Sequence, residues 1–164
     1  MTRGRVIALL LAIIAQLVAF GPARAACHAQ STCVCGVSAS GVNFGNYNPL
    51  APANLDIAGM VNVECIQSQP RPLSFVVNLS AGGSGGYATR RMVGGSSQLQ
   101  YNLFRDAAHA QVWGDGTGVS TNVTRSFNGQ RIVDDTINVY GRVFSGQTVN
   151  SGAYVDTIVV TVIY

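Results

Sequence analysis

The chain has 164 residues, a formal net charge of +3, and charged side chains at only 10% of its positions. All ten basic residues are arginines, and three of them (Arg3, Arg5 and Arg24) lie within the first 25 residues, so ten minus three leaves seven arginines against seven carboxylates in the rest. This balance argues against a nucleic-acid-binding protein, which usually carries a basic surplus. Abundant Gly, Ser, Thr, Asn and Val favour an exported all-β domain.

The first 25 residues have the pattern of a secretory signal peptide. Arginines precede an apolar run from Val6 to Phe20, and Ala23-Arg24-Ala25 matches the small-x-small pattern of a cleavage site. The apolar run is shorter than the roughly 20 residues that a membrane-spanning helix needs. We therefore predict cleavage after Ala25 and a single domain formed by residues 26–164.

Four cysteines follow the predicted signal peptide, and export to an oxidising compartment makes disulfides the first expectation. Cys33 and Cys35 lie two residues apart on an expected strand, so they pair awkwardly with each other. Of the three possible pairings we favour Cys35–Cys65, which joins the first two strands, with Cys27–Cys33 as a local loop. Closing a loop of roughly thirty residues stabilises the fold by about 3–4 kcal/mol. A metal site formed by Cys27, His28, Cys33 and Cys35 is the alternative, but it lacks the paired C-x-x-C spacing of structural zinc sites.

Short runs with period-two alternation, separated by turn residues, fill the rest of the chain. No stretch has convincing helical periodicity, so the pattern predicts an all-β sandwich or barrel. Residues 82–86, Gly-Gly-Ser-Gly-Gly, are expected to form a flexible loop. The expected strands before the last one cover residues 37–47, 55–66, 73–79, 99–104, 121–127 and 136–144.

The last strand is apolar on both faces. Ile158, Val160, Val162 and Tyr164 alternate with Thr and with further apolar residues, and such a strand belongs inside a sheet with a neighbour on each side. The sequence offers no following strand. We therefore expect the second neighbour to come either from an earlier segment or from another molecule.

No motif predicts catalysis. The run from Gly82 to Gly86 formally matches G-x-S-x-G, but no helix follows Ser84 and only His109 lies downstream as a possible base. His109 is expected to be a solvated loop residue. Trp113, with Tyr101 and Tyr154, could form a sugar-stacking platform, although aromatic residues more often fill the core of a sandwich. We predict no enzymatic activity, cofactor, metal or small-molecule substrate.

An ordered series of motifs resembles the spore coat protein U domain family. The run Cys35-x-Val-Ser-Ala-Ser-Gly-Val-Asn-Phe-Gly-Asn-Tyr-Asn-Pro is similar to the opening signature of that family, and further matches extend along essentially all of residues 26–164. They include Arg90-Arg91-Met92 and Trp113-Gly-Asp-Gly. The matching positions taken as candidate site residues are Phe44, Gly45, Tyr47, Arg91, Met92, Tyr101, Asp106, Trp113, Tyr140, Gly141, Gly152, Tyr154 and Asp156.

The resemblance implies a subunit of an archaic chaperone–usher pilus, exported to the periplasm and then to the cell surface, and serving adhesion and biofilm formation. The implied fold is an immunoglobulin-like sandwich that lacks its final strand. A periplasmic chaperone and then another pilus subunit, delivered at an outer-membrane usher, would supply that strand by β-strand addition. Ile158, Val160, Val162 and Tyr164 would then line the groove that accepts it.

The segment before the first strand departs from the pattern of a strand donor. A donor needs alternating bulky apolar residues, whereas residues 26–34 offer alanines and cysteines in place of large side chains, and a Cys27–Cys33 bridge would keep the segment looped. We therefore expect a minor or terminal subunit. The alternative function is a self-contained secreted coat protein or carbohydrate-binding β-sandwich module.

Overall fold

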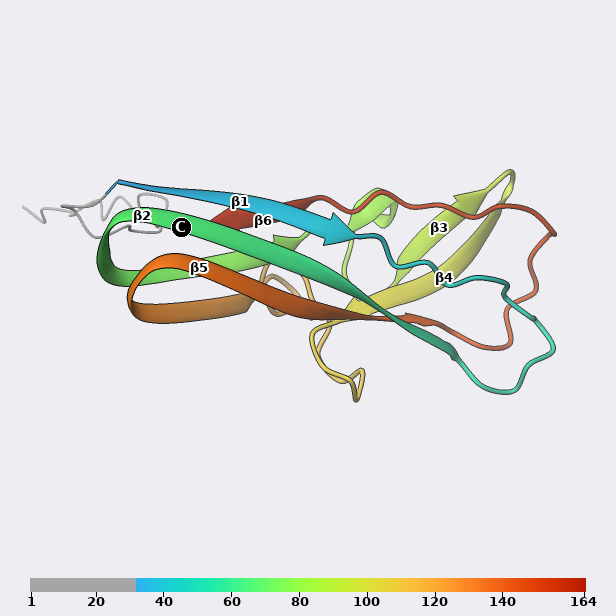
Figure 1. Cartoon of the computed structure of the whole chain (residues 1–164). Helices are drawn as coiled ribbons and strands as arrows, with labels where there is room; N and C mark the ends of the chain where they lie inside the picture. Colours follow the sequence, from blue (N-terminus) through green and yellow to red (C-terminus); the bar gives the residue numbers. More distant parts are fainter. Residues whose placement is uncertain (1–31) are drawn as a thin grey trace, which may run out of the picture.

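The computed structural model describes residues 32–164, which form an antiparallel β-structure (Figure 1). The all-β prediction is confirmed, and residues 32–164 include no helix long and apolar enough to cross a membrane. The elements are β1 (Cys33–Ser40), β2 (Leu55–Leu79), the 3₁₀ turn η1 (Gly82–Ser84), β3 (Arg90–Gly94), β4 (Ser97–Phe104), β5 (Val123–Val143) and β6 (Val160–Ile163).

Two strands are much longer than the sequence pattern predicted. β2 has 25 residues and β5 has 21, where we expected separate strands at 55–66 and 73–79, and at 121–127 and 136–144. Both strands bend back at one end of the molecule, where the β2–β5 register shifts (Figure 1). Gln67 explains why the pairing survives the bend: its buried side-chain amide donates to the carbonyl oxygens of Arg71 and Gln130, at 3.1 and 2.9 Å.

The bend folds the sheet into two layers. In one layer the order is β1, the first half of β2, the second half of β5, β4 and β3. In the other layer β6 pairs with the second half of β2, which pairs with the first half of β5. This is the arrangement of an immunoglobulin-like sandwich, in which two antiparallel sheets enclose one core.

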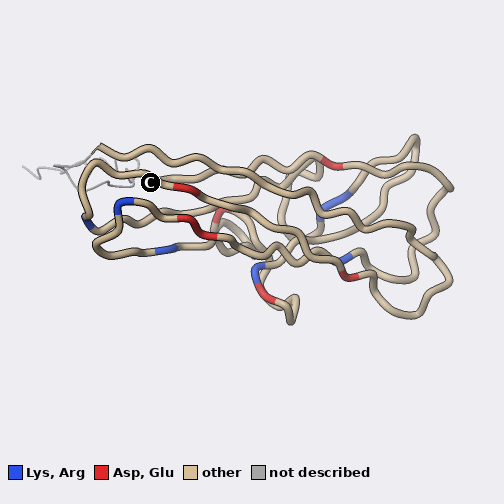
Figure 2. The backbone as a smooth tube through the Cα atoms, in the orientation of Figure 1, with Lys and Arg blue, Asp and Glu red and all other residues tan. Residues whose placement is uncertain are grey.

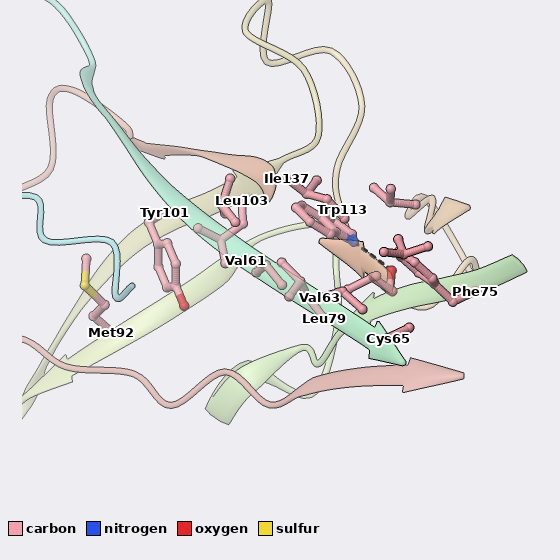
Figure 3. Packing of buried hydrophobic residues seen from close by; sticks show 14 of the residues in the cluster. Val61, Val63, Cys65, Phe75, Leu79, Met92, Tyr101, Leu103, Trp113 and Ile137 are labelled. Carbon is pink, nitrogen blue, oxygen red and sulfur yellow. Dashed lines mark hydrogen bonds between the residues drawn. The ribbon is translucent and has the colours of Figure 1, made fainter. Parts of the chain in front are cut away.

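Inward-facing side chains of both layers pack into one apolar cluster, with Tyr101 and Met92 at one end and Phe75 and Cys65 at the other (Figure 3). Trp113 is fully buried in it, and its indole N–H donates to the carbonyl oxygen of Val77 at 3.0 Å. Tyr101 is also a core residue, only 3% exposed. Burial of these two rings rules out the sugar-stacking platform considered from the sequence.

Cys35 and Cys65 lie opposite each other in the β1–β2 ladder and form a disulfide, as the sequence predicts. Because Cys35 is bonded in this way, it is not a ligand of the alternative metal site. Cys33 is also disulfide-bonded. Cys27 and the cleavage position after Ala25 lie outside the described residues, so the Cys27–Cys33 pairing and the signal peptide stay predictions.

Candidate functional site

The last strand has a neighbour on one side only. β6 pairs with β2 from Val76↔Ile163 to Leu79↔Val160, and no other strand of residues 32–164 pairs with it. β1 likewise pairs only with β2. The free edges of β1 and β6 lie side by side along the molecule (Figure 1). Each presents unpaired backbone N–H and C=O groups, which can form a ladder with an added strand.

A cleft continues from these edges, between the segment that follows β1 and the segment that precedes β6, and we call it the edge groove: the space between residues 39–49 and residues 149–160. Its narrower part has a volume of about 300 Å³ and its wider part about 720 Å³. The two parts share lining residues, among them Val42, Phe44 and Met92, so they form one continuous groove. Core residues such as Val61 and Leu103 line the narrower part, so the groove opens directly onto the core.

The four residues predicted to line a strand-accepting groove all pack against the core yet remain half-buried. Ile158 and Val160 line the narrower part of the edge groove. Val162 and Tyr164 lie beyond it, towards the end of the chain. The inward-facing residues of β2 that pair with β6 are covered far better: Val77 is 0% and Leu79 2% exposed. The core is therefore incompletely covered along β6.

The opposite side of the sandwich is protected. There Arg125 and Asp135 of β5 occupy positions that alternate in phase with buried residues, and they form an ion pair at 3.0 Å. Inward-pointing charges at an edge are a common defence against unwanted strand pairing. β1 and β6 carry no charged residue at all, as Figure 2 shows. The edges of β1 and β6 therefore lack the feature that would repel an added strand.

One wall of the groove, residues 155–159, is fixed to the rest of the domain. Val155 and Val93 exchange two backbone hydrogen bonds, at 2.8 and 3.1 Å. Farther along, the N–H of Ser80 donates to the carbonyl oxygen of Val159, and the N–H of Val159 donates to the Ser80 hydroxyl, both at 2.9 Å. These bonds hold the wall to β3 and to the end of β2.

Asp156 lies in the same wall and also lines the narrower part of the groove. Its carboxylate accepts hydrogen bonds from the Tyr101 hydroxyl at 2.7 Å, the Gly83 N–H at 2.9 Å and the N–H of Thr157 at 2.8 Å. Gly82, with φ of 64°, lies so close that a Cβ there would overlap the carboxylate. Burial, and then the hydrogen bond to Asp156, raise the pKa of Tyr101, so its hydroxyl stays protonated and can donate.

Arg90 is the functional residue that sequence reasoning missed. It is fully buried beneath this wall, where its guanidinium donates to the carbonyl oxygens of Ser80 and Trp113, both at 2.8 Å, and to Asn102 Oδ1 at 2.7 Å. Burial lowers the pKa of Arg90. The sequence directed attention to Arg91, which is exposed. The sequence did hold a signal for Arg90. Side chains two residues apart on a strand point to the same face, so Arg90 shares the buried face of Met92.

Other motif residues surround the wider part of the groove. Phe44, Gly45 and Tyr47 line one side, while Gly152 and Tyr154 line the other. The Tyr47 hydroxyl accepts a backbone N–H at 2.9 Å, and the Tyr154 hydroxyl donates to a backbone carbonyl at 2.7 Å. Both phenols therefore stabilise the loops that shape this end of the groove.

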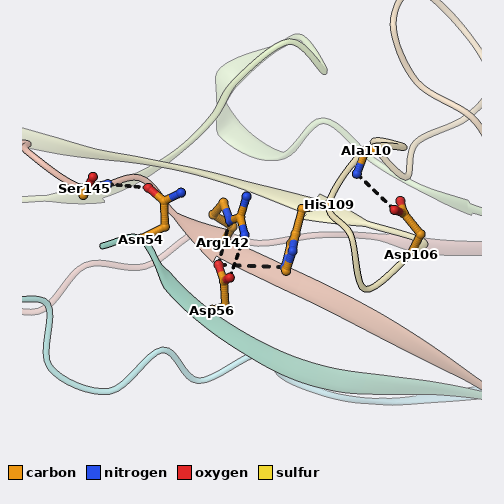
Figure 4. Close-up of polar contacts among 7 residues, drawn as sticks. All are labelled: Asn54, Asp56, Asp106, His109, Ala110, Arg142 and Ser145. Atoms are coloured by element: carbon orange, nitrogen blue, oxygen red, sulfur yellow. Dashed lines mark hydrogen bonds and ion pairs between the residues drawn. The ribbon is translucent and has the colours of Figure 1, made fainter. Parts of the chain in front are cut away.

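His109 lies outside the groove and is not the solvated residue that we expected. Its side chain is only 8% exposed, because its ring packs edge-on against Phe104 and Tyr140. Its Nε2 lies 3.8 Å from Asp56 Oδ1, and Asp56 accepts two hydrogen bonds from Arg142, both at 2.7 Å (Figure 4). Tyr140 therefore belongs to this cluster, away from the groove.

Asp106 shapes the loop that carries His109. Its carboxylate accepts the N–H groups of Ala110 and Gln111, at 3.0 and 2.7 Å (Figure 4 shows the first of these). The structure thus places some motif residues at the groove and others elsewhere: Trp113 in the core, Arg91 on the surface, and Asp106 and Tyr140 around the His109 loop. Within residues 32–164, no three His, Cys, Asp or Glu side chains are grouped so that they could share a metal ion.

Comparisons with known proteins agree with this geometry. A family profile described as Spore Coat Protein U domain matches residues 21–161. Protein U of Myxococcus xanthus is 31% identical over 170 residues, covering 92% of each chain. A chain in the crystal structure of the CsuC–CsuE chaperone–tip adhesion subunit pre-assembly complex, from archaic chaperone–usher Csu pili of Acinetobacter baumannii, matches with a TM-score of 0.56. That match covers 81% of this chain and 40% of the other at 21% identity, so it establishes likeness of fold alone.

Proposed function

The chain belongs to the Spore Coat Protein U domain family, and from that premise we propose that it is a non-enzymatic subunit of an archaic chaperone–usher pilus. The observation that carries the proposal is the edge groove, an opening onto the core that begins at the unpaired edges of β1 and β6. A strand from a periplasmic chaperone, and then one from another pilus subunit at the outer-membrane usher, would fill it by β-strand addition. The fold likeness to a chain from a chaperone–subunit complex supports the same partners.

We further propose that the subunit is minor or terminal in its fibre and serves adhesion and biofilm formation at the cell surface, after export through a cleaved signal peptide. The support for its position is the composition of residues 26–34, which offer few bulky apolar side chains to a neighbouring groove. Such a chain accepts a strand but is a poor donor. A peptide of residues 26–35 that fills the groove of a strand-depleted subunit tightly would contradict this.

The experiment that tests the main proposal uses purified residues 26–164 and a peptide of about twelve residues in which valine alternates with threonine. At about 3.3 Å per residue, such a peptide extends over about 40 Å. Without the peptide we expect low stability and self-association, because the core is open. With the peptide we expect stoichiometric binding and a higher unfolding temperature, since a ligand that binds only the folded state stabilises it.

Two variants make the test specific. Val160→Asp places a charge in the groove and should abolish peptide binding, because an unpaired charge in an apolar site is costly. Val119→Asp is the matched control at an exposed loop position, and it should bind as the unaltered chain does. A monomeric, stable chain that ignores the peptide would instead identify a self-contained secreted coat or carbohydrate-binding module.

A further inference from the structure

On the basis of the function proposed above, we infer that Tyr101 and Asp156 are positioning residues for strand capture, because together they set the spacing between the two walls of the edge groove. Neither residue needs to touch the incoming backbone for this role. Their effect is to hold the wall formed by residues 155–159 at the distance from residues 39–44 that one added strand requires.

Tyr101, a labelled core side chain in Figure 3, contacts both walls of the groove. Its ring meets Phe44 of the first wall edge-on, with ring centroids 5.8 Å apart and planes at 70°. Its hydroxyl donates to Asp156 of the second wall at 2.7 Å. A single rigid side chain, rooted in the middle of β4, therefore links the two walls through the floor of the groove.

Asp156 transmits this anchoring to the backbone of its wall. Because its other carboxylate oxygen accepts the N–H groups of Gly83 and Thr157, the carboxylate ties the wall to η1 as well as to β4. The close approach of Gly82 leaves no room for the carboxylate to shift in that direction. The wall is thus pinned at Asp156, between its backbone bonds at Val155 and Val159.

Arg90 fixes Tyr101 and the same wall from below. It lies opposite Tyr101 in the β3–β4 ladder, and no carboxylate of residues 32–164 lies within ion-pair distance of it. Its buried positive charge interacts at longer range with the Asp156 carboxylate, and it also holds the carbonyl oxygen of Ser80, whose N–H and hydroxyl bond Val159. The charge of Arg90, acting on Asp156, and its hydrogen bonds to Ser80 therefore both hold residues 155–159 in place.

The spacing of the walls matters because an added strand must lie about 4.8 Å from its neighbour to form ladder hydrogen bonds, which weaken steeply with poor geometry. If residues 155–159 move towards β1, the groove becomes too narrow for an added strand. If they move away from β1, the ladder hydrogen bonds to the added strand become too long. The hydroxyl–carboxylate bond opposes both movements while leaving the outer edge of the wall free to pair.

The test is Tyr101→Phe, which removes one hydroxyl and keeps the ring. We expect the valine–threonine peptide to dissociate about tenfold faster or more from this variant, the effect of losing one hydrogen bond to a charged acceptor. Hydrogen exchange at the amides of Val155 and Val159 should also accelerate in the peptide-free protein. Tyr140→Phe is the matched control outside the groove, and it should leave both readouts unchanged.

Asp156 provides a rescue experiment. Asp156→Asn keeps one oxygen that can accept a hydrogen bond and should retain more of the peptide affinity than Asp156→Ala, which removes all three hydrogen bonds of the carboxylate and should lose at least as much affinity as Tyr101→Phe. A purely structural role would lower the stability of the peptide-free chain, accelerate exchange along the whole sandwich and not at Val155 and Val159 in particular, and leave the peptide off-rate unaltered, and that result would overturn the inference. If the unaltered chain binds no peptide, the proposed function fails and the inference falls with it.

Discussion

Gly141 of β5 lies directly against the ring of Phe44, so that a Cβ at position 141 would stand 2.7 Å from the ring carbon Cζ. The same Cβ would stand 2.7 Å from a methyl group of Val42. Both neighbours belong to the wall of the edge groove that continues from β1. The absence of a side chain at Gly141 therefore lets this wall pack flat on the sheet and places Phe44 where it meets Tyr101.

Gly141→Ala should destabilise the domain by about 1–3 kcal/mol, the usual cost of overpacking a well-filled core. Gly36→Ala on β1 is the matched control, since a Cβ there meets nothing within 4 Å, and it should change stability little. Urea unfolding of each variant with the strand peptide bound measures both. Equal midpoints for the two variants would show that Phe44 can move away without cost.

Arg90→Met should lower the free energy of unfolding by about 3 kcal/mol or more. The substitution keeps an unbranched apolar stem but leaves the buried acceptors of Ser80, Trp113 and Asn102 without their donor. Arg91→Met, one residue along and exposed, should stay within about 0.5 kcal/mol of the unaltered chain. Chemical denaturation of the pair is the measurement, and similar losses would refute the assignment of Arg90 as the structural arginine.

Replacing Cys35 and Cys65 together by alanine should reduce stability by about 3–4 kcal/mol in the chain-entropy model. The Cys35–Cys65 bond joins β1 directly to the strand that it pairs with, so without it the amides of β1 should also lose protection from hydrogen exchange. Ser38→Ala on the same strand serves as the control. Unchanged exchange in β1 of the double variant would mean that the ladder alone secures this edge.

The Asp56–Arg142 pair should contribute a small acid-sensitive part of the stability. The hydrogen bonds from Arg142 lower the pKa of Asp56, so the folded state binds its proton less readily than the unfolded chain does. The contribution is therefore complete above about pH 5 and is lost as the pH falls below the ordinary Asp value of about 3.9. For an exposed bidentate pair we expect about 0.5–1 kcal/mol.

Urea unfolding of Arg142→Met from pH 7 to pH 3 tests this, with Arg91→Met as the charge-matched control. The two stability curves should differ at neutral pH and converge in acid. If the difference in the free energy of unfolding between the two variants stays constant from pH 7 to pH 3, Arg142 contributes through packing and not through its charge.

Period-two alternation was enough to identify the inward-facing residues, the first disulfide and the all-β class. It did not reveal the length of β2 and β5, because polar and turn-forming residues at a bend look the same as those of a loop. The side-chain amide of Gln67, which replaces ladder hydrogen bonds there, becomes visible only in three dimensions.

The candidate site was predictable in part for the same reason. Alternation marked Ile158 and Val160, but it misjudged the other wall: we expected a strand at 37–47, whereas β1 ends at Ser40 and residues 41–49 form no strand. His109 was misjudged because its burial depends on a loop folded around the Asp106 carboxylate, a local hydrogen-bond arrangement that hydrophobic patterning does not encode.

The path of β2 and β5 through both layers has a mechanical consequence. A tensile load applied at the start of β1 would pass through the covalent Cys35–Cys65 bond into β2, which is paired along its length with β5. The ladder bonds would then be strained collectively, in shear, and neither sheet could peel away by itself. Under such a load the two layers of the sandwich would therefore unfold together and not one after the other.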